Sequence, residues 1–177
     1  PPERRVHLAV DDVMIVVDLD EGARGVGWTV AGHQLLGHYG DPAVEHGMYP
    51  MAPWAGRIRD NSVTWNGQEH VLPVTHDPWA IHGTALAQPA SVLELTQDAD
   101  EARLIARIEE HPGWPWPMAV DIEWHLRPRE LTTSITVRAL DESFPAVVGW
   151  HPWFRRQLDA GAPLELSMRA SERLVRG

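Results

Sequence analysis

Apolar and polar residues alternate over short runs along most of this chain, which is the pattern of half-buried β-strands. The clearest run is 118–126, where four apolar residues fall on one side: Val120, Ile122, Trp124 and Leu126. Residues 131–140 are rich in β-branched side chains, which favour extended backbone. Further strands are expected at 6–10, 13–19, 26–30, 33–36, 62–65, 68–72, 91–96, 103–108 and 146–150. The pattern predicts a chain made almost entirely of strands.

A β-hairpin is predicted around Asn66-Gly67, because this pair accepts the positive φ angles of a two-residue type I′ turn. A hairpin brings the chain back to its starting point, so the residues on either side of it lie close together. Arg57 comes just before the hairpin and His82 follows it, next to Gly83. We therefore expect Arg57 and His82 to face one pocket.

Three segments interrupt the strand pattern. Residues 40–50 contain Gly-Asp-Pro and Tyr-Pro, and we expect an irregular loop there. Residues 111–117 contain three prolines, which exclude a helix or a central strand. Residues 101–110 are compatible with either a helix or a strand. With no linker or repeat visible, we predict one all-β domain over residues 1–177, an antiparallel β-sandwich.

Composition narrows the possible partners and locations. A net charge of −10 repels phosphate backbones, so nucleic acid is not an expected partner. No apolar run reaches membrane-spanning length, and no apolar signal segment follows the N-terminus, so we expect no membrane partner and a cytoplasmic location. Cysteine is absent, which excludes disulfides and a thiolate metal site. The oligomeric state remains open.

Histidine and tryptophan are the residue types most relevant to chemistry. None of the ten histidines shows the ligand spacing of a zinc site, and we predict no metal and no cofactor. The nine tryptophans are mostly expected in the core. One or two could instead stack on a sugar ring, because an indole offers a flat apolar face beside a polar group. A small-molecule sugar is therefore a candidate partner.

Two residues have both a structural and a functional interpretation. His151 follows the strand predicted at 146–150 and has three aromatic neighbours in sequence, so it is either a core histidine or a proton-transfer group in an aromatic-walled pocket. Arg57 could form a surface ion pair with Asp60 or Asp41, but Gly56 before it favours a fixed orientation. From spacing alone, the core interpretation of His151 is favoured over the proton-transfer interpretation.

Five short motifs occur in a specific order. They are Pro53-Trp54-Ala55-Gly56-Arg57-Ile58, Trp65-Asn66-Gly67, Leu72-Pro73, His82-Gly83 and Gly149-Trp150-His151-Pro152-Trp153-Phe154. Each is weak alone, but the ordered set resembles the aldose 1-epimerase (galactose mutarotase-like) family. Two features differ from that family: Trp153 stands where tyrosine is more common, and the segment after Gly83 lacks a tryptophan often found there.

The resemblance implies a galactose mutarotase-like supersandwich that interconverts the α and β anomers of an aldohexose. It implies that His151 protonates the ring oxygen, that His82 is a second catalytic histidine in the same region, and that Arg57 orients the substrate. Trp54 and Trp153 are the candidate sugar-contacting aromatics. The family's glutamate base falls beyond the last residue of this chain, so we expect a truncated domain with an open sheet edge.

Two alternatives to this function follow from the residues. A hexose-6-phosphate 1-epimerase would need a cationic cluster, which Arg57, Arg59, Arg155 and Arg156 could supply. A non-catalytic sugar-binding module could keep the cleft and lack the base. Glu165 and Glu172 are the last acidic residues of the chain, and we interpret both as solvated charges.

Overall fold

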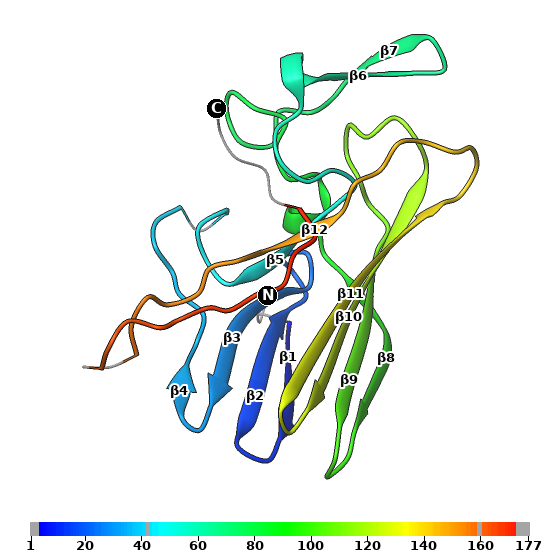
Figure 1. Cartoon of the computed structure of the whole chain (residues 1–177). Coiled ribbons are helices and arrows are strands. Elements are labelled where there is room, and N and C mark those ends of the chain that lie inside the picture. The colour runs from blue at the N-terminus through cyan, green and yellow to red at the C-terminus, as the bar shows by residue number, and fades with distance from the viewer. Residues whose placement is uncertain (1–3, 42, 159–160, 173–177) are drawn as a thin grey trace.

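The computed structural model describes residues 4–41, 43–158 and 161–172, and it consists almost entirely of antiparallel strands (Figure 1). The strands are β1 (Arg5–Val10), β2 (Val13–Asp18), β3 (Arg24–Val30), β4 (His33–Gln34), β5 (Met48–Met51), β6 (Ser62–Trp65), β7 (Gln68–Val71), β8 (Ser91–Gln97), β9 (Ala102–Ile108), β10 (Met118–Arg127), β11 (Glu130–Ala139) and β12 (Gly149–Pro152). Two short 3₁₀ helices are η1 (Arg59–Asn61) and η2 (Ala85–Ala87). Neither is long or apolar enough to cross a membrane, and the described residues contain no other helix.

Two sheets face each other and form a sandwich. The first sheet has the strand order β1-β2-β3-β5-β12, with β4 also paired to β3. The second has the order β11-β10-β9-β8. The β6–β7 hairpin is a separate two-stranded sheet that stands away from both layers (Figure 1). The predicted all-β antiparallel sandwich is confirmed, and β12 ends the first sheet with β5 as its partner among the described strands.

The core lies between the two sheets, because the inward positions of both are apolar. The four alternating residues of β10 are all fully buried: Val120, Ile122, Trp124 and Leu126. From the first sheet, Leu8 and Ile15 are fully buried as well. Trp124 connects the layers, since its Nε1 donates a hydrogen bond to the Ala23 carbonyl oxygen at 3.0 Å. Burial of these side chains is the main force that holds the sheets together.

The hairpin predicted at Asn66-Gly67 forms as expected. Asn66 has φ of 50° and Gly67 has φ of 77°, the left-handed values that a type I′ turn needs. The chain then returns to its starting point, because Arg57 and Ile81 form an isolated antiparallel bridge. The segments on either side of the hairpin therefore lie next to each other.

Strand β5 corrects the prediction of an irregular loop over 40–50. Its four residues pair with β12, and Tyr49 is almost fully buried, with 1% of its surface exposed. Pro50 has no N–H to donate, which is the reason for expecting a break there. Pairing with a strand far along the chain outweighs the loss of one donor, and local sequence carries no signal of that pairing.

The segment 101–110 contains strand β9 and no helix, which confirms the strand predicted at 103–108. Two other boundaries differ from the prediction. Strand β4 ends at Gln34 instead of residue 36, and Leu36 then forms an isolated bridge with Phe154. The strand expected at 146–150 is observed at Gly149–Pro152, so His151 lies inside it. Its register with β5 sets these limits, which the apolar run Val147-Val148 does not reveal.

Candidate active site

Strand β12 sorts its side chains onto two opposite faces, as the backbone pleat requires. Trp150 points into the core, where its ring packs edge to face on Trp124 with 5.0 Å between centroids. His151 therefore points to the other face of the sheet. Its direct cross-strand partner on β5 is Tyr49, and Trp153 follows two positions later on the same side.

Two aromatic rings stack on the imidazole of His151. Its centroid lies 4.9 Å from that of Tyr49, with 11° between the planes, and 5.3 Å from that of Trp153, with 29° between the planes. The sequence led us to expect Trp150, Trp153 and Phe154 around the imidazole, and this expectation is wrong for Trp150 and Phe154. Trp150 is directed into the core, and Phe154 packs against the ring of Trp28 at 6.3 Å. Sequence reasoning missed Tyr49, because it lay in the predicted loop.

His82 is held by the backbone of the segment that precedes the hairpin. Its N–H donates to the Gly56 carbonyl oxygen at 3.0 Å, and the Gly56 N–H donates to its Nδ1 at 3.2 Å. Nδ1 is therefore an acceptor, and the neutral ring carries its proton on Nε2. His82 has φ of 61°, a left-handed conformation that is uncommon for a residue with a side chain.

The two imidazoles meet at the surface of the first sheet. The ring centroids of His82 and His151 lie 5.1 Å apart, and the planes are inclined by 68°. The ring of Tyr49 also lies 6.1 Å from that of His82. Residues far apart in the chain thus form one cluster, as the order of the motifs predicts.

Burial lowers the pKa of both imidazoles, and neighbouring charge adds to the shift at His82. Burial lowers the pKa of His82 to about 4, with further lowering by the nearby His151 and Arg57. Burial also lowers the pKa of His151, and an interaction with its own backbone opposes this shift. The Nδ1 of His151 is buried and has no hydrogen-bond partner among the described residues. Both rings are therefore mainly neutral at pH 7.

Arg57 is exposed and lies beside this cluster. Its guanidinium carbon is 5.9 Å from the ring centroid of Trp79, a cation–π contact. Asp41, one of its two possible ion-pair partners, contacts His76 at 3.7 Å instead. Because the charge of Arg57 contributes to the lowered pKa of His82, the two side chains share one electrostatic environment.

Comparison with known proteins agrees with this architecture. Residues 6–168 match the aldose 1-epimerase family, which is most of the chain. The chain belongs to the aldose 1-epimerase family. The sheet order and the histidine cluster described above are therefore features of an aldose 1-epimerase family member.

Three proteins similar to this family member share low sequence identity with it. The chain is 26% identical over 115 aligned residues to the uncharacterized protein YphB of Escherichia coli strain K12. The aligned part is 63% of this chain and 38% of YphB. Its fold is similar to that of a galactose mutarotase-like protein from Clostridium acetobutylicum, with a TM-score of 0.77 and 17% identity, over 87% of this chain and 51% of that protein. It is also similar to the Slr1438 protein from Synechocystis sp. PCC 6803, with a TM-score of 0.73 and 21% identity, over 87% of this chain and 55% of that protein. The chain spans about half the length of these two solved structures.

Trp54 lies in a different part of this aldose 1-epimerase family member. Its side chain is 4% exposed, its Nε1 donates to the Ala80 carbonyl oxygen at 3.2 Å, and its ring stacks on Trp114 at 5.6 Å. It belongs to a small second core with Leu72. Its burial supports a packing role in place of the sugar contact suggested for it. Trp153 is the predicted aromatic that the structure brings to the histidines.

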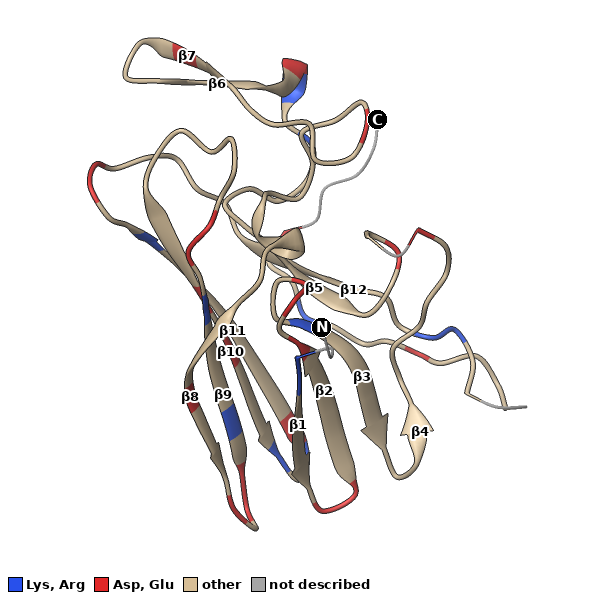
Figure 2. Ribbon diagram, turned by 180° about the vertical axis from the view of Figure 1, so that it is seen from behind, with Lys and Arg blue, Asp and Glu red and all other residues tan. Residues whose placement is uncertain are grey.

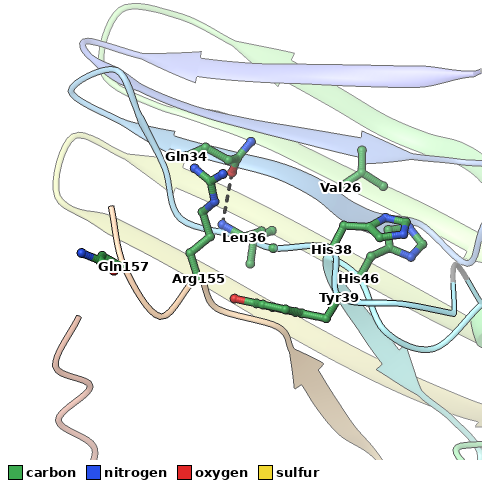
Figure 3. Close-up of a pocket in the computed structure, with 9 residues that line it drawn as sticks. Val26, Gln34, Leu36, His38, Tyr39, His46, Arg155 and Gln157 are labelled. Atoms are coloured by element: carbon green, nitrogen blue, oxygen red, sulfur yellow. Dashed lines mark hydrogen bonds between the residues drawn. The ribbon is translucent and has the colours of Figure 1, made fainter. Parts of the chain in front are cut away.

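A hollow of about 540 Å³ lies near the aromatic cluster. Figure 3 shows Tyr39 and Arg155 on one side of it and the rings of His38 and His46 together on another. None of the five predicted site residues lines it. It connects to the cluster through Tyr39, whose ring lies 5.6 Å from Trp153. Among the described residues, no group of three or more histidine, aspartate or glutamate side chains could hold a metal ion.

Proposed function

We propose that this chain supplies the histidine side of a sugar site that interconverts the α and β anomers of an aldohexose. The proposal is carried by one observation, the pair of imidazoles with centroids 5.1 Å apart. Opening a hemiacetal requires proton transfer at two oxygens held in one place. Two adjacent, mainly neutral imidazoles suit an uncharged polar substrate such as a sugar.

In the proposed reaction a base removes the proton from the anomeric hydroxyl, and an acid protonates the ring oxygen. The bond between the anomeric carbon and the ring oxygen then breaks, the aldehyde rotates, and the ring closes on the other face. We assign the acid to Nε2 of His151, because its Nδ1 is buried. The ring donates this proton from its imidazolium form and takes it back from the open-chain hydroxyl when the sugar ring closes. His82 donates a hydrogen bond from Nε2 to the sugar, and Arg57 orients the sugar hydroxyls. Trp153 packs against the sugar ring.

The base is the part of this reaction that the described residues do not supply. Within residues 4–41, 43–158 and 161–172, no hydrogen bond or ion pair joins a carboxylate to His82 or His151. Glu165 and Glu172 are both exposed. Since the chain spans about half the length of its solved relatives, we propose that the base comes from polypeptide outside the described residues.

A free sugar fits better than a sugar phosphate. A phosphate pocket would require Arg57 and Arg59 to lie with Arg155 and Arg156. Figure 2 shows basic segments at separate places, one at the short helix leading into β6 and the other after β12. This separation of the two basic segments favours a free sugar over a hexose 6-phosphate.

A non-catalytic sugar-binding module is the second candidate, and the lack of a carboxylate contact to either imidazole among the described residues favours it. Polarimetry of freshly dissolved α-glucose separates the two functions, with binding followed by isothermal calorimetry on the same sample. Acceleration of mutarotation supports the epimerase. Binding without acceleration by the full-length protein supports the module, and absence of both contradicts a sugar site.

A further inference from the structure

One backbone carbonyl fixes both of the rings that stack on His151. The carbonyl oxygen of Val44 accepts a hydrogen bond from the hydroxyl of Tyr49 at 3.1 Å and another from Nε1 of Trp153 at 2.7 Å. Tyr49 lies in β5 and Trp153 directly follows β12, and both rings stack on the imidazole of His151. The position of Val44 therefore determines the walls around His151.

The turn that carries Val44 is itself held in place. The Asp41 carboxylate accepts a hydrogen bond from the Ala43 N–H at 2.8 Å, and its carbonyl accepts one from the Glu45 N–H at 2.7 Å. Arg24 donates to the carbonyl oxygens of Ala43 at 2.7 Å and His46 at 3.4 Å. A single guanidinium thus contacts the chain on both sides of Val44.

Arg24 is unusual because it is charged and only 1% exposed. Burying a guanidinium costs free energy unless its donors and its charge are satisfied. Here Glu21 lies 3.6 Å from its Nε, and its guanidinium carbon lies 4.8 Å from the ring centroid of Tyr49. The cation therefore contacts both the turn and one of the rings that the turn holds.

The hydroxyl of Tyr49 stays protonated under ordinary conditions. Burial raises the pKa of Tyr49 to about 12, although the charge of Arg24 opposes the shift. The phenol is therefore a hydrogen-bond donor throughout the neutral range, and its bond to the Val44 carbonyl persists. The bond from the Trp153 indole does not depend on pH at all.

We propose that Arg24 and Tyr49 are positioning residues that hold the imidazole of His151 in one orientation, through the Val44 turn and the stacked rings of Tyr49 and Trp153. The meaning of this orientation for catalysis rests on the function proposed above. The orientation itself is a property of the folded chain and is measured without substrate. Neither residue touches the reacting atoms, so each acts on the reaction through His151.

Nuclear magnetic resonance relaxation of the histidine rings tests this inference. The signals of His151 are assigned by their loss in His151→Asn. We expect Tyr49→Leu and Arg24→Gln to increase the motion of the His151 ring while the amide signals of β12 stay in place. Tyr39 is the matched control, because it is the other tyrosine and contacts Trp153 but not His151. Tyr39→Leu should leave the His151 ring as ordered as in the parent.

A second variant covers the case in which Tyr49→Leu does not fold. The double variant Tyr49→Phe with Trp153→Phe keeps two aromatic rings and removes both hydrogen bonds to the Val44 carbonyl. More motion of the His151 ring in this variant supports the inference. A His151 ring that stays as ordered as in the parent, in a folded variant, overturns it.

Kinetics separate this inference from the proposed function. Where the parent accelerates mutarotation, Tyr49→Leu should lower kcat about tenfold or more with little change in KM, because misorientation affects the reacting geometry. Tyr49→Phe keeps the stacked ring and the Trp153 bond but loses the bond to the Val44 carbonyl, so its kcat should lie between those of Tyr49→Leu and the parent. Full-length protein that binds sugar without accelerating mutarotation contradicts the proposed catalytic function, but the ring-motion measurement still decides whether Arg24 and Tyr49 position His151.

Discussion

The two central imidazoles are close neighbours with different surroundings. His82 uses its Nδ1 to accept a hydrogen bond from the Gly56 backbone, so protonation of that nitrogen would break a bond. His151 has a buried Nδ1 and two stacked aromatic rings. The backbone therefore assigns a fixed tautomer to one ring, and packing fixes the orientation of the other.

The pH dependence of stability follows from His82. Its pKa is about 4 in the folded chain against an ordinary value of 6.5, so the unfolded chain takes up the proton first as pH falls. The stabilising contribution is complete above pH 6.5 and is lost as pH falls from 6.5 towards 4. We expect the Tm of the parent to fall over this range and the slope to be smaller in His82→Asn. An unchanged slope in His82→Asn would contradict the assignment.

Substitution of His151 tests its proposed role as acid. His151→Asn should lower kcat for mutarotation about a hundredfold with little loss of fold. A positioned proton donor typically accelerates a reaction by about this factor or more. His82→Asn should change both KM and kcat, since a hydrogen-bond donor to the same region acts on binding as well. Initial rates by polarimetry with circular dichroism on the same samples measure both effects. Parent-like turnover in His151→Asn would remove it from the mechanism.

At the scale of elements, two short segments place the histidines. Strand β12 sends His151 out of the core by alternation, and a left-handed turn at His82-Gly83 places the other ring. Gly83 has φ of +78°, and a Cβ there would overlap the Ala52 carbonyl oxygen. That oxygen accepts hydrogen bonds from the N–H groups of Thr84 and Ala85. This turn therefore has no room for a side chain.

Alanine at this turn should be costly. Gly83→Ala combines a strained φ with a backbone clash, and we expect a loss of about 3 kcal/mol in the free energy of unfolding. Gly67→Ala is the matched control, because Gly67 has φ of +77° and no atom lies within 4 Å of the place where a Cβ would stand. It should cost about 1 kcal/mol. Urea unfolding of the two variants compares them directly, and equal losses would show that the clash at Gly83 is relieved.

Sequence reasoning recovered the parts of the fold that depend on local pattern. Strand β10 and the Asn66-Gly67 hairpin carry strong periodic or turn signals, and both were placed correctly. It missed strand β5, and with it Tyr49, because the pairing with β12 is long-range. Arg24 could have been noticed as a basic residue between the small residues Ala23 and Gly25, but nothing local shows that it contacts the Val44 turn.

The candidate site shows the same division. His82, His151 and Arg57 were selected because each lies in one of the ordered motifs, and their proposed roles remain predictions. Trp54 was chosen for its place in a motif, and its burial could not be read from that place. Contacts between side chains of separate strands depend on register, which no single segment encodes.

At the scale of the whole molecule, one tryptophan joins the two layers and the strand of His151. Trp124 is fully buried, bonds to the Ala23 carbonyl and supports Trp150. Trp124→Leu should lower the free energy of unfolding by about 3 kcal/mol through the cavity and the lost bond. Trp79→Leu is the control, because Trp79 is 43% exposed, and it should change stability by about 0.5 kcal/mol or less. Urea unfolding measures both, and a small loss at Trp124 would contradict its role between the layers.

The alternation along β12 determines both which residue packs in the core and which lies on the opposite face, so its register cannot shift without affecting both. A slip of one residue against β5 would bury an imidazole and expose Trp150 on the face that now carries His151. Insertions or deletions of a single residue within 149–153 would therefore damage the core and the site in one step. The stretch 140–148 ahead of it has no strand register to preserve, so length variation among homologues should be greater there than within 149–153.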